Sequence, residues 1–517
     1  MLASISRVSS WTMLSRILGF IRDWSLAVLF GSQSGLDAFL LAFSLPNTLR
    51  RIFAEGSFSQ AFIPVLCETQ TQANNDAEKK LINQMGSYLL LSLLITVLVL
   101  MLVSPVLLKI VAPGFAMHGR RYHIAQHCLL WMLPFLLCIS MATFFHALLQ
   151  SKHRYTLPAG SPVILNLFFL LGAWLFHKEI QPFYGLAAFV SFAGLLQWFL
   201  AWFFAKKHGF DWHFRLHALS KQSKAVIKLI GQSLFASAIG PIIVWVDFCL
   251  ASFLPQGSIT WLYLSQRLVY LPLGSFAVAI STVSLPYLSK LSHVSQKGLF
   301  FKTARFTLLC NLLLALPASL ALYLLAKPMI ITLFAKGQFI DTDVLKTCLS
   351  LKALCLGLPA FMLNKSLVSI YVSQQNIKPT VKAAWISLLV NVLLSLVLMW
   401  PMGHVGLALS SSVAAWVQCG LLLCWQKALL DWTQTEKKHL KHICLGSGVM
   451  AFVLSMLSST QLPAWSFETS HAGLHASLSL LVLIFIGLFV YTAWMYRSAV
   501  LKYCYQTNKE LSSTLKA

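Results

Sequence analysis

The chain is a series of long apolar runs separated by short polar segments. A helix needs about 20 mostly apolar residues to cross a bilayer. On that length the predicted spans lie near 8–31, 35–66, 82–112, 124–149, 157–177, 183–205, 225–254, 258–289, 303–326, 344–371, 380–401, 404–426, 442–459 and 473–496. The first two spans carry charges, and the second is broken. The pattern predicts an all-α, polytopic membrane protein with fourteen transmembrane helices.

Composition supports this class, because 58% of the residues are apolar and only 10% are charged. A soluble domain carries about 25% charged residues to cover its surface. The shortage of charge excludes a soluble enzyme, a secreted disulfide scaffold and a disordered regulator. The cysteines lie mostly inside apolar runs, where they act as small hydrophobic residues.

The net charge of +24 indicates orientation rather than nucleic-acid binding. If the N-terminus is cytoplasmic, the inner segments hold 25 of the 39 Lys and Arg residues and the outer loops hold five. Cytoplasmic loops of membrane proteins collect basic residues in this way. We therefore expect both termini in the cytoplasm and no nucleic-acid partner.

Weak internal matches recur in order along the chain. Pro158, Gly185-Leu186-Ala187 and Gln197 recur at one offset of 221, and Gly56-Ser57-Phe58 recurs as Gly274-Ser275-Phe276. Each repeat holds six spans, so both halves have the same orientation, as in transporters with parallel repeats. The predicted domains are an N-terminal lobe at 1–223, a C-terminal lobe at 224–435, and two extra helices with a cytoplasmic tail at 436–517.

Arginines within the predicted spans are the main candidates for function. They are Arg16, Arg22, Arg50, Arg51 and Arg267. An arginine at the bilayer centre costs roughly 2.5–3.5 kcal/mol on insertion scales, so it usually faces a polar cavity. Charge pairing between helices is the structural alternative for Arg16 and Arg22.

Acidic residues offer partners for some of these arginines. Asp23 lies seven residues after Arg16, on the same helical face, and is its predicted partner. Arg51 and Glu55 are four residues apart and are interpreted as a structural pair. Removing both pairs leaves Arg22, Arg50 and Arg267 against two acids, Asp37 and Asp247.

The remaining charge is cationic, and arginine suits bidentate recognition of phosphate or carboxylate. The sequence therefore predicts an anionic headgroup as cargo, with pyrophosphate as the favoured chemistry.

Asp247 and Asn391 are a weak candidate pair for a cation. No nucleotide-binding or hydrolase motif appears, so we expect neither catalysis nor a cofactor. A coupling ion or the membrane potential would supply the energy.

Two stretches carry a family resemblance. The run from Val8 to Asp23 and the run from Asp37 to Pro64, which contains Leu49-Arg50-Arg51-Ile52-Phe53-Ala54-Glu55-Gly56-Ser57-Phe58, closely resemble the MurJ (MviN) lipid II flippases. Ala112-Pro113-Gly114-Phe115, Ala251-Ser252-Phe253-Leu254 and Gln266-Arg267-Leu268 match as well. That family belongs to the multidrug/oligosaccharidyl-lipid/polysaccharide exporter superfamily.

The resemblance implies two six-helix lobes around a cationic cavity, with two extra helices that hold a polyprenyl tail. It implies translocation of lipid II, an undecaprenyl-pyrophosphate disaccharide-pentapeptide, to the outer leaflet of the bacterial inner membrane by alternating access. The family's substrate-critical residues would fall on Arg16, Arg22, Asp37, Arg50 and Arg267. Expected partners are lipid II, membrane lipids and other cell-wall synthesis proteins.

Some positions depart from the family pattern. Gln266 and Tyr270 stand beside Arg267 where some relatives have acids, so charge balance there differs.

Two other transport functions are alternatives to moving lipid II. The protein could be a flippase for another polyprenyl-pyrophosphate-linked oligosaccharide, or a small-molecule antiporter of the same superfamily that carries a drug or cation. An acidic cavity would favour the antiporter. A polyprenyl-phosphate enzyme would need a catalytic acid or base near an aqueous face.

Overall fold

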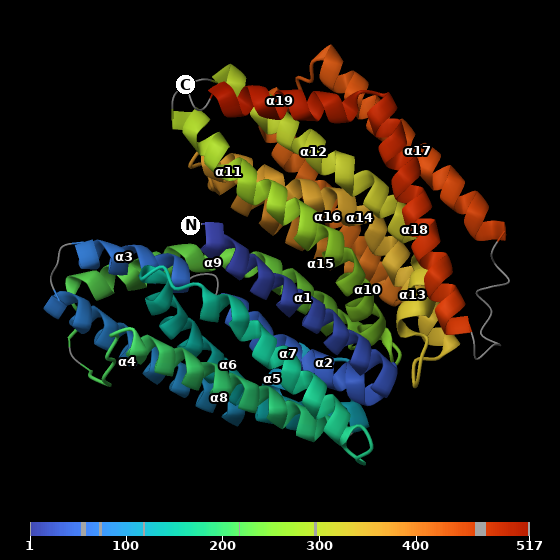
Figure 1. The fold of residues 1–517 in the computed structure, drawn as a ribbon. Coiled ribbons are helices and arrows are strands. Elements are labelled where there is room, and N and C mark those ends of the chain that lie inside the picture. The colour runs from blue at the N-terminus through green and yellow to red at the C-terminus, as the bar shows by residue number, and fades with distance from the viewer. Residues whose placement is uncertain are drawn as a thin grey trace. The chain divides into compact units, whose positions relative to one another are not determined.

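The described part of the chain is built from helices and contains no strand (Figure 1). The computed structural model describes residues 2–52, 58–71, 75–116, 119–216, 218–293, 297–460 and 472–514. The first helices are α1 (Leu2–Phe30), α2 (Ser34–Arg50), α3 (Ser59–Thr71), α4 (Asn75–Leu102), α5 (Ser104–Val111), α6 (Arg120–Ser151), α7 (Thr156–Phe176), α8 (Pro182–Lys207) and α9 (Lys221–Ala251).

The second half of the chain continues in the same way. Its helices are α10 (Ser258–Pro272), the π-helix η2 (Leu273–Ala277), α11 (Val278–His293), α12 (Lys297–Leu324), α13 (Ala326–Phe334), α14 (Asp341–Ser373), α15 (Lys378–Met402), α16 (His404–Trp425), the 3₁₀ turn η3 (Lys427–Leu429), α17 (Gln434–Thr460), α18 (Ala472–Arg497) and α19 (Val500–Thr514).

Eleven helical segments of the described chain are long and apolar enough to cross a membrane. The all-α, polytopic prediction is confirmed, while the count of fourteen stays a prediction. The first two predicted spans are missing from the eleven for visible reasons: α1 carries Arg16, Arg22 and Asp23, and α2 has only 17 residues. For the seventh, the structure gives the shorter apolar stretch Gly240–Ala251 at the end of α9.

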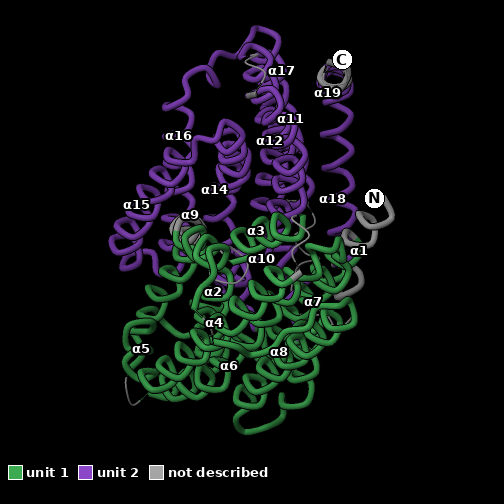
Figure 2. Tube along the Cα trace, turned by 90° about the vertical axis from the view of Figure 1, so that its left-hand side faces the viewer, with its two compact units in different colours: residues 1–260, 337–339 green, residues 261–336, 340–517 purple. Residues whose placement is uncertain are grey.

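Packing divides the chain into two compact units (Figure 2). Unit 1 comprises residues 1–260 and 337–339, and unit 2 comprises 261–336 and 340–517. Helix α9 belongs to unit 1, where it packs on α2, α3 and α4. The sequence repeat predicts two lobes with a boundary near residue 223. Packing into units does not test that repeat, so the lobes stay a prediction.

The helix boundaries repeat along the chain in the order that the sequence matches suggest. Helix α6 begins at Arg120 and α14 at Asp341, which is the offset of 221 found in the sequence. The short helices α5 and α13 occupy equivalent places before them, each after a break in a longer helix. The second Gly-Ser-Phe copy lies within η2; in the first copy only Phe58 is described, and it too is in a π-helical turn.

Aromatic side chains fill the core of unit 1 between α2, α6 and α7. Phe43 contacts Phe169 edge-to-face at a ring distance of 5.2 Å and contacts Phe135 at 6.4 Å. Helices α6 and α8 lie side by side (Figure 1), and Gly194 allows this because a Cβ there would press on Phe135. Unit 2 has two apolar clusters, one centred on α12, α14 and α16 and one on α12, α17 and α18.

Candidate substrate-binding site

Arg22 is held in a buried polar cluster between α1 and α7. The residue is 7% exposed, and its Nε and Nη2 donate to Oδ1 of Asp23 at 2.9 and 2.7 Å. Its Nη1 donates to Oδ1 of Asn166 at 3.0 Å, and Asn166 in turn donates to the carbonyl oxygen of Ser15. The guanidinium also lies over the Phe169 ring, 4.9 Å from its centroid. These contacts fix both the position and the plane of the guanidinium.

The sequence missed Asn166, because an asparagine in an apolar run gives no signal of what it faces. The sequence proposed Arg16 as the partner of Asp23. The structure shows the guanidinium of Arg22 on this carboxylate, and the Arg16–Asp23 pairing stays a prediction. Arg16 is an exposed residue of α1. The two arginines do diverge on the helix, as their spacing of six residues predicts.

Arg50 ends α2, where its Nη2 donates to Oδ1 of Asn47 at 3.0 Å. It is half-buried, and the next residue, Arg51, is exposed in a π-helical turn. Pro46 lies inside α2, where it removes a backbone donor one turn before Arg50. Glu55 lies outside the described residues, so the predicted Arg51–Glu55 pair stays a prediction.

Asp37 is fully buried and holds the start of α10 rather than an arginine. The backbone N–H of Gly257 donates to its Oδ2 at 2.6 Å. The N–H and the hydroxyl of Thr260 donate to its Oδ1 at 2.9 and 2.7 Å. The first N–H groups of a helix have no partner within the helix, and a carboxylate there also meets the positive end of the helix dipole. Asp37 therefore acts as an N-terminal cap supplied from 220 residues away.

Arg267 belongs to α10 and is half-buried in unit 2. Its Nη2 donates to the hydroxyl of Tyr263 at 2.8 Å, and its guanidinium lies 4.6 Å from the centroid of the same ring. The neighbours that depart from the family pattern, Gln266 and Tyr270, are half-buried and exposed respectively. A tyrosine one helical turn away thus contacts this arginine from its own helix.

The weak cation candidates fall in different units. Asp247 is buried in α9 of unit 1, and Asn391 is buried in α15 of unit 2, where its Nδ2 donates to the Ser411 hydroxyl. Among the described residues, no three His, Cys, Asp or Glu side chains gather to hold a metal ion. The cation pair stays a prediction.

An apolar groove of about 310 Å³ lies in unit 2, beside the helix that carries Arg267. Its walls come from α10, η2, α12, α13 and α18, and include Leu268, Phe276, Leu322, Met329 and Ile484. Helix α18 corresponds to the predicted span at 473–496, one of the two spans predicted to fall outside the sequence repeat. An apolar groove on a helix that also carries an arginine suits an amphiphilic ligand with an anionic head.

A helical chain with many apolar segments long enough to span a membrane, a buried arginine, an apolar groove and helices that repeat in order defines a polytopic membrane transporter. Comparison with known proteins gives the family. A family model described as lipid II flippase MurJ matches residues 26–476. The chain belongs to the lipid II flippase MurJ family.

Individual relatives agree with this assignment. A probable lipid II flippase MurJ of Buchnera aphidicola subsp. Acyrthosiphon pisum is 32% identical over 476 residues, which cover 91% of this chain and 92% of the relative. The lipid II flippase MurJ of Burkholderia cenocepacia is 32% identical over 420 residues, which cover 80% of this chain and 81% of the relative.

Solved structures show the same fold. A structure described as lipid II flippase MurJ in an inward closed conformation matches with a TM-score of 0.80 at 26% identity, covering 96% of this chain and 98% of that chain. An inward-facing multidrug resistance MATE transporter of the MOP superfamily matches with a TM-score of 0.67 at 12% identity, covering 82% and 97%. The second likeness concerns the fold alone.

Proposed function

We propose that this chain translocates lipid II from the cytoplasmic to the outer leaflet of a bacterial inner membrane. The observation that carries the proposal is the family match over residues 26–476, together with a structural match to a lipid II flippase across 96% of the chain. Transport proceeds by alternating access, and no covalent bond of the substrate is made or broken.

The pyrophosphate is bound by Arg16, Arg22, Arg50 and Arg267. The planar guanidinium group can donate two parallel hydrogen bonds to a phosphate, which lysine cannot do. Arg22 is already oriented by Asp23 and Asn166, so it contributes a positive charge in a fixed position. A positioned charge loses little entropy when the ligand binds.

Asp37 acts through α10 in this proposal. Its carboxylate fixes the first turn of the helix whose later turn carries Arg267. The sequence resemblance placed Asp37 among the substrate-critical residues; here it contributes by positioning the helix rather than by touching the substrate.

The polyprenyl tail lies in the apolar groove of unit 2. Apolar tails bind by burying hydrocarbon surface, at about 25 cal/mol per Å². Ile484 of α18 contributes to this groove, which supports a tail-guiding role for the extra C-terminal helices.

Membrane lipids and other cell-wall synthesis proteins are the further proposed partners. Both termini are proposed to be cytoplasmic.

The test replaces the arginines in a strain that depends on this chain for growth. In Arg50→Ala and Arg267→Ala variants we expect lipid II to accumulate in the inner leaflet, with arrival at the outer leaflet reduced about 10- to 100-fold, since each loses a charge-assisted contact. Arrival is measured by the access of an externally added enzyme to lipid II. Lys302→Ala, an exposed position in α12, is the matched control and should transport normally. Normal arrival in both arginine variants would overturn the cavity assignment.

A further inference from the structure

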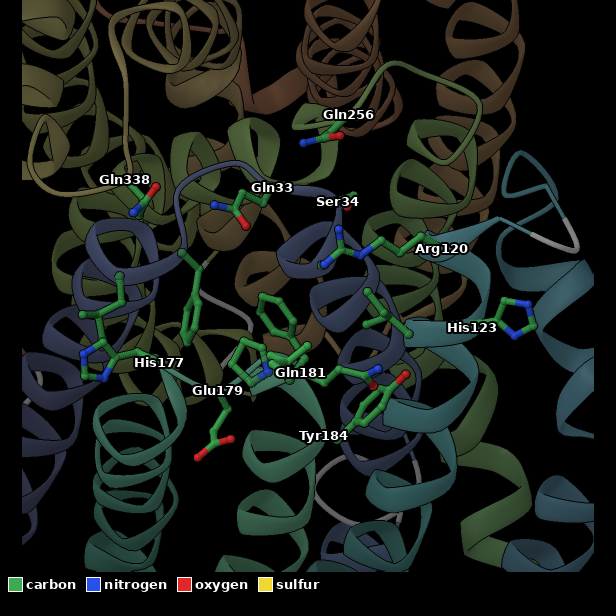
Figure 3. A pocket seen from close by; sticks show the side chains of 17 residues that line it. Gln33, Ser34, Arg120, His123, His177, Glu179, Gln181, Tyr184, Gln256 and Gln338 are labelled. Carbon is green, nitrogen blue, oxygen red and sulfur yellow. The ribbon is translucent and has the colours of Figure 1, made fainter.

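A second site lies at one end of unit 1, where a pocket of about 710 Å³ is formed (Figure 3). The turn between α1 and α2, the start of α6 and the loop between α7 and α8 surround it, and residues 256 and 338 complete its wall. None of the arginines proposed to bind pyrophosphate lines it. We call it the rim pocket.

Two glycines fix the backbone on one side of the rim pocket. Gly31 and Gly337 have φ values of +60° and +62°, a region that disfavours any side chain. A Cβ on Gly31 would collide with the carbonyl oxygen of Gln338, and a Cβ on Gly337 would collide with that of Val28. The N–H of Gln338 donates to the Val28 carbonyl oxygen at 2.9 Å. Gln338 is therefore held at the end of α1 by main-chain contacts.

Aromatic rings form the inner wall of the pocket. Phe30 and Phe183 are 4% and 6% exposed, and their ring centroids are 4.9 Å apart. Gly35 makes room for Phe183, because a Cβ there would overlap its ring. This part of the wall is apolar.

Glutamine is the commonest polar residue around the opening. The glutamines come from four different segments: Gln33, Gln181, Gln256 and Gln338. Each amide both donates and accepts hydrogen bonds, which matches the hydroxyl and acetamido groups of a sugar. The sticks in Figure 3 place these residues around the pocket, with Ser34 and Tyr184 adding hydroxyl groups.

The charge of the pocket is nearly balanced. Arg120 and Glu179 are its one guanidinium and one carboxylate among the lining residues. His123 and His177 also line it, but no group of three potential metal ligands gathers in the described chain. A pocket of this size, with an apolar wall and a rim of neutral amides, suits a neutral polar ligand better than an anion or a metal.

We propose that the rim pocket binds an N-acetylated sugar unit of the lipid-linked head group on the outer side of the membrane. This inference rests on the proposed function and on a cytoplasmic N-terminus. With that orientation α1 runs outward, so the turn after Phe30 lies on the outer face. The pocket then receives the disaccharide as the head group leaves the pyrophosphate site.

The test measures binding of a soluble neutral disaccharide, N,N′-diacetylchitobiose, to the purified full-length protein by saturation-transfer difference NMR. Gln33→Ala and Gln338→Ala should each weaken binding about fivefold, as expected for one lost hydrogen bond. Gln33 is suited to this test because its side chain makes no capping bond to α2. Gln434→Ala, at an exposed glutamine of unit 2, is the matched control and should bind as the unaltered chain does.

Three outcomes would overturn the proposal. They are absence of disaccharide binding, binding that both variants leave unchanged, and binding of a soluble D-Ala-D-Ala-terminated pentapeptide in place of the disaccharide. The same variants are assayed for arrival of lipid II at the outer leaflet. If the unaltered chain binds the disaccharide but moves no lipid II, the proposed function fails; if it moves lipid II but binds no disaccharide, only the rim pocket fails.

Discussion

At the scale of single residues, the cluster around Arg22 shows how an arginine is tolerated inside a membrane helix. A buried charge is costly unless it is paired and its hydrogen bonds are satisfied. Asp23 supplies the countercharge, and Asn166 from α7 accepts a further N–H. Neighbouring residues on a helix point in different directions, so a helical wheel pairs Asp23 with Arg16. The wheel does not show that the long Arg22 side chain folds back onto Asp23, the residue beside it.

Removing this arginine should destabilise the protein strongly. Arg22→Ala removes the guanidinium that donates two hydrogen bonds to the buried Asp23 carboxylate, and breaking such a pair costs about 3–5 kcal/mol. The midpoint of thermal unfolding of the detergent-purified protein reports the loss. In an Arg22→Gln, Asp23→Asn double variant the charge is removed from both partners, and the loss should be markedly smaller. Equal losses in the single and double variants would contradict a paired charge.

At the scale of elements, helix positions follow from hydropathy but helix contacts do not. The predicted span at 157–177 corresponds to α7 (Thr156–Phe176), and that at 404–426 to α16 (His404–Trp425). The predicted span at 82–112 is instead divided into α4 and α5 at Val103, just before Pro105. Hydropathy does not register such a break because both sides are equally apolar.

The role of Asp37 illustrates the same limit. An acid in an apolar run is a clear signal of a polar partner, and the sequence identified it. The partner is the backbone of α10, whose N–H groups leave no trace in the pattern of side chains. The candidate residue was therefore predictable, but its contact was not.

Asp37→Asn should loosen the start of α10. The amide replaces one acceptor oxygen with a donor, which opposes the N–H of Gly257 or Thr260, and loss of an N-terminal cap costs about 0.5–2 kcal/mol. Hydrogen exchange in the first turn of α10 should become faster. Asp341→Asn, an exposed acid in the first turn of α14, is the control and should change stability by only a few tenths of a kcal/mol. Unchanged exchange in α10 would show that Asp37 does not hold it.

At the scale of the whole molecule, the distribution of basic residues is the basis of the predicted orientation. Lys206 and Lys207 end α8 and Lys221 begins α9, on either side of a loop predicted to be cytoplasmic, whereas Lys178 is the one Lys or Arg residue in the loop after α7. The division into units was not predictable from the repeat, because it depends on which helices pack together. Helix α9 corresponds to the span predicted to start the second repeat, but it packs on α2, α3 and α4 of unit 1.

The predicted orientation can be checked with fusions to alkaline phosphatase, which becomes active only where its disulfides form, outside the cytoplasm. A fusion after Lys178, in the loop between α7 and α8, should be highly active, because an odd number of predicted spans precedes it. A fusion after Lys207, one span later, should be inactive. Immunoblots provide the control, since both fusions must accumulate to similar levels. The opposite pattern of activity would invert the topology and place the rim pocket on the cytoplasmic face, where a sugar leaving the transporter could not reach it.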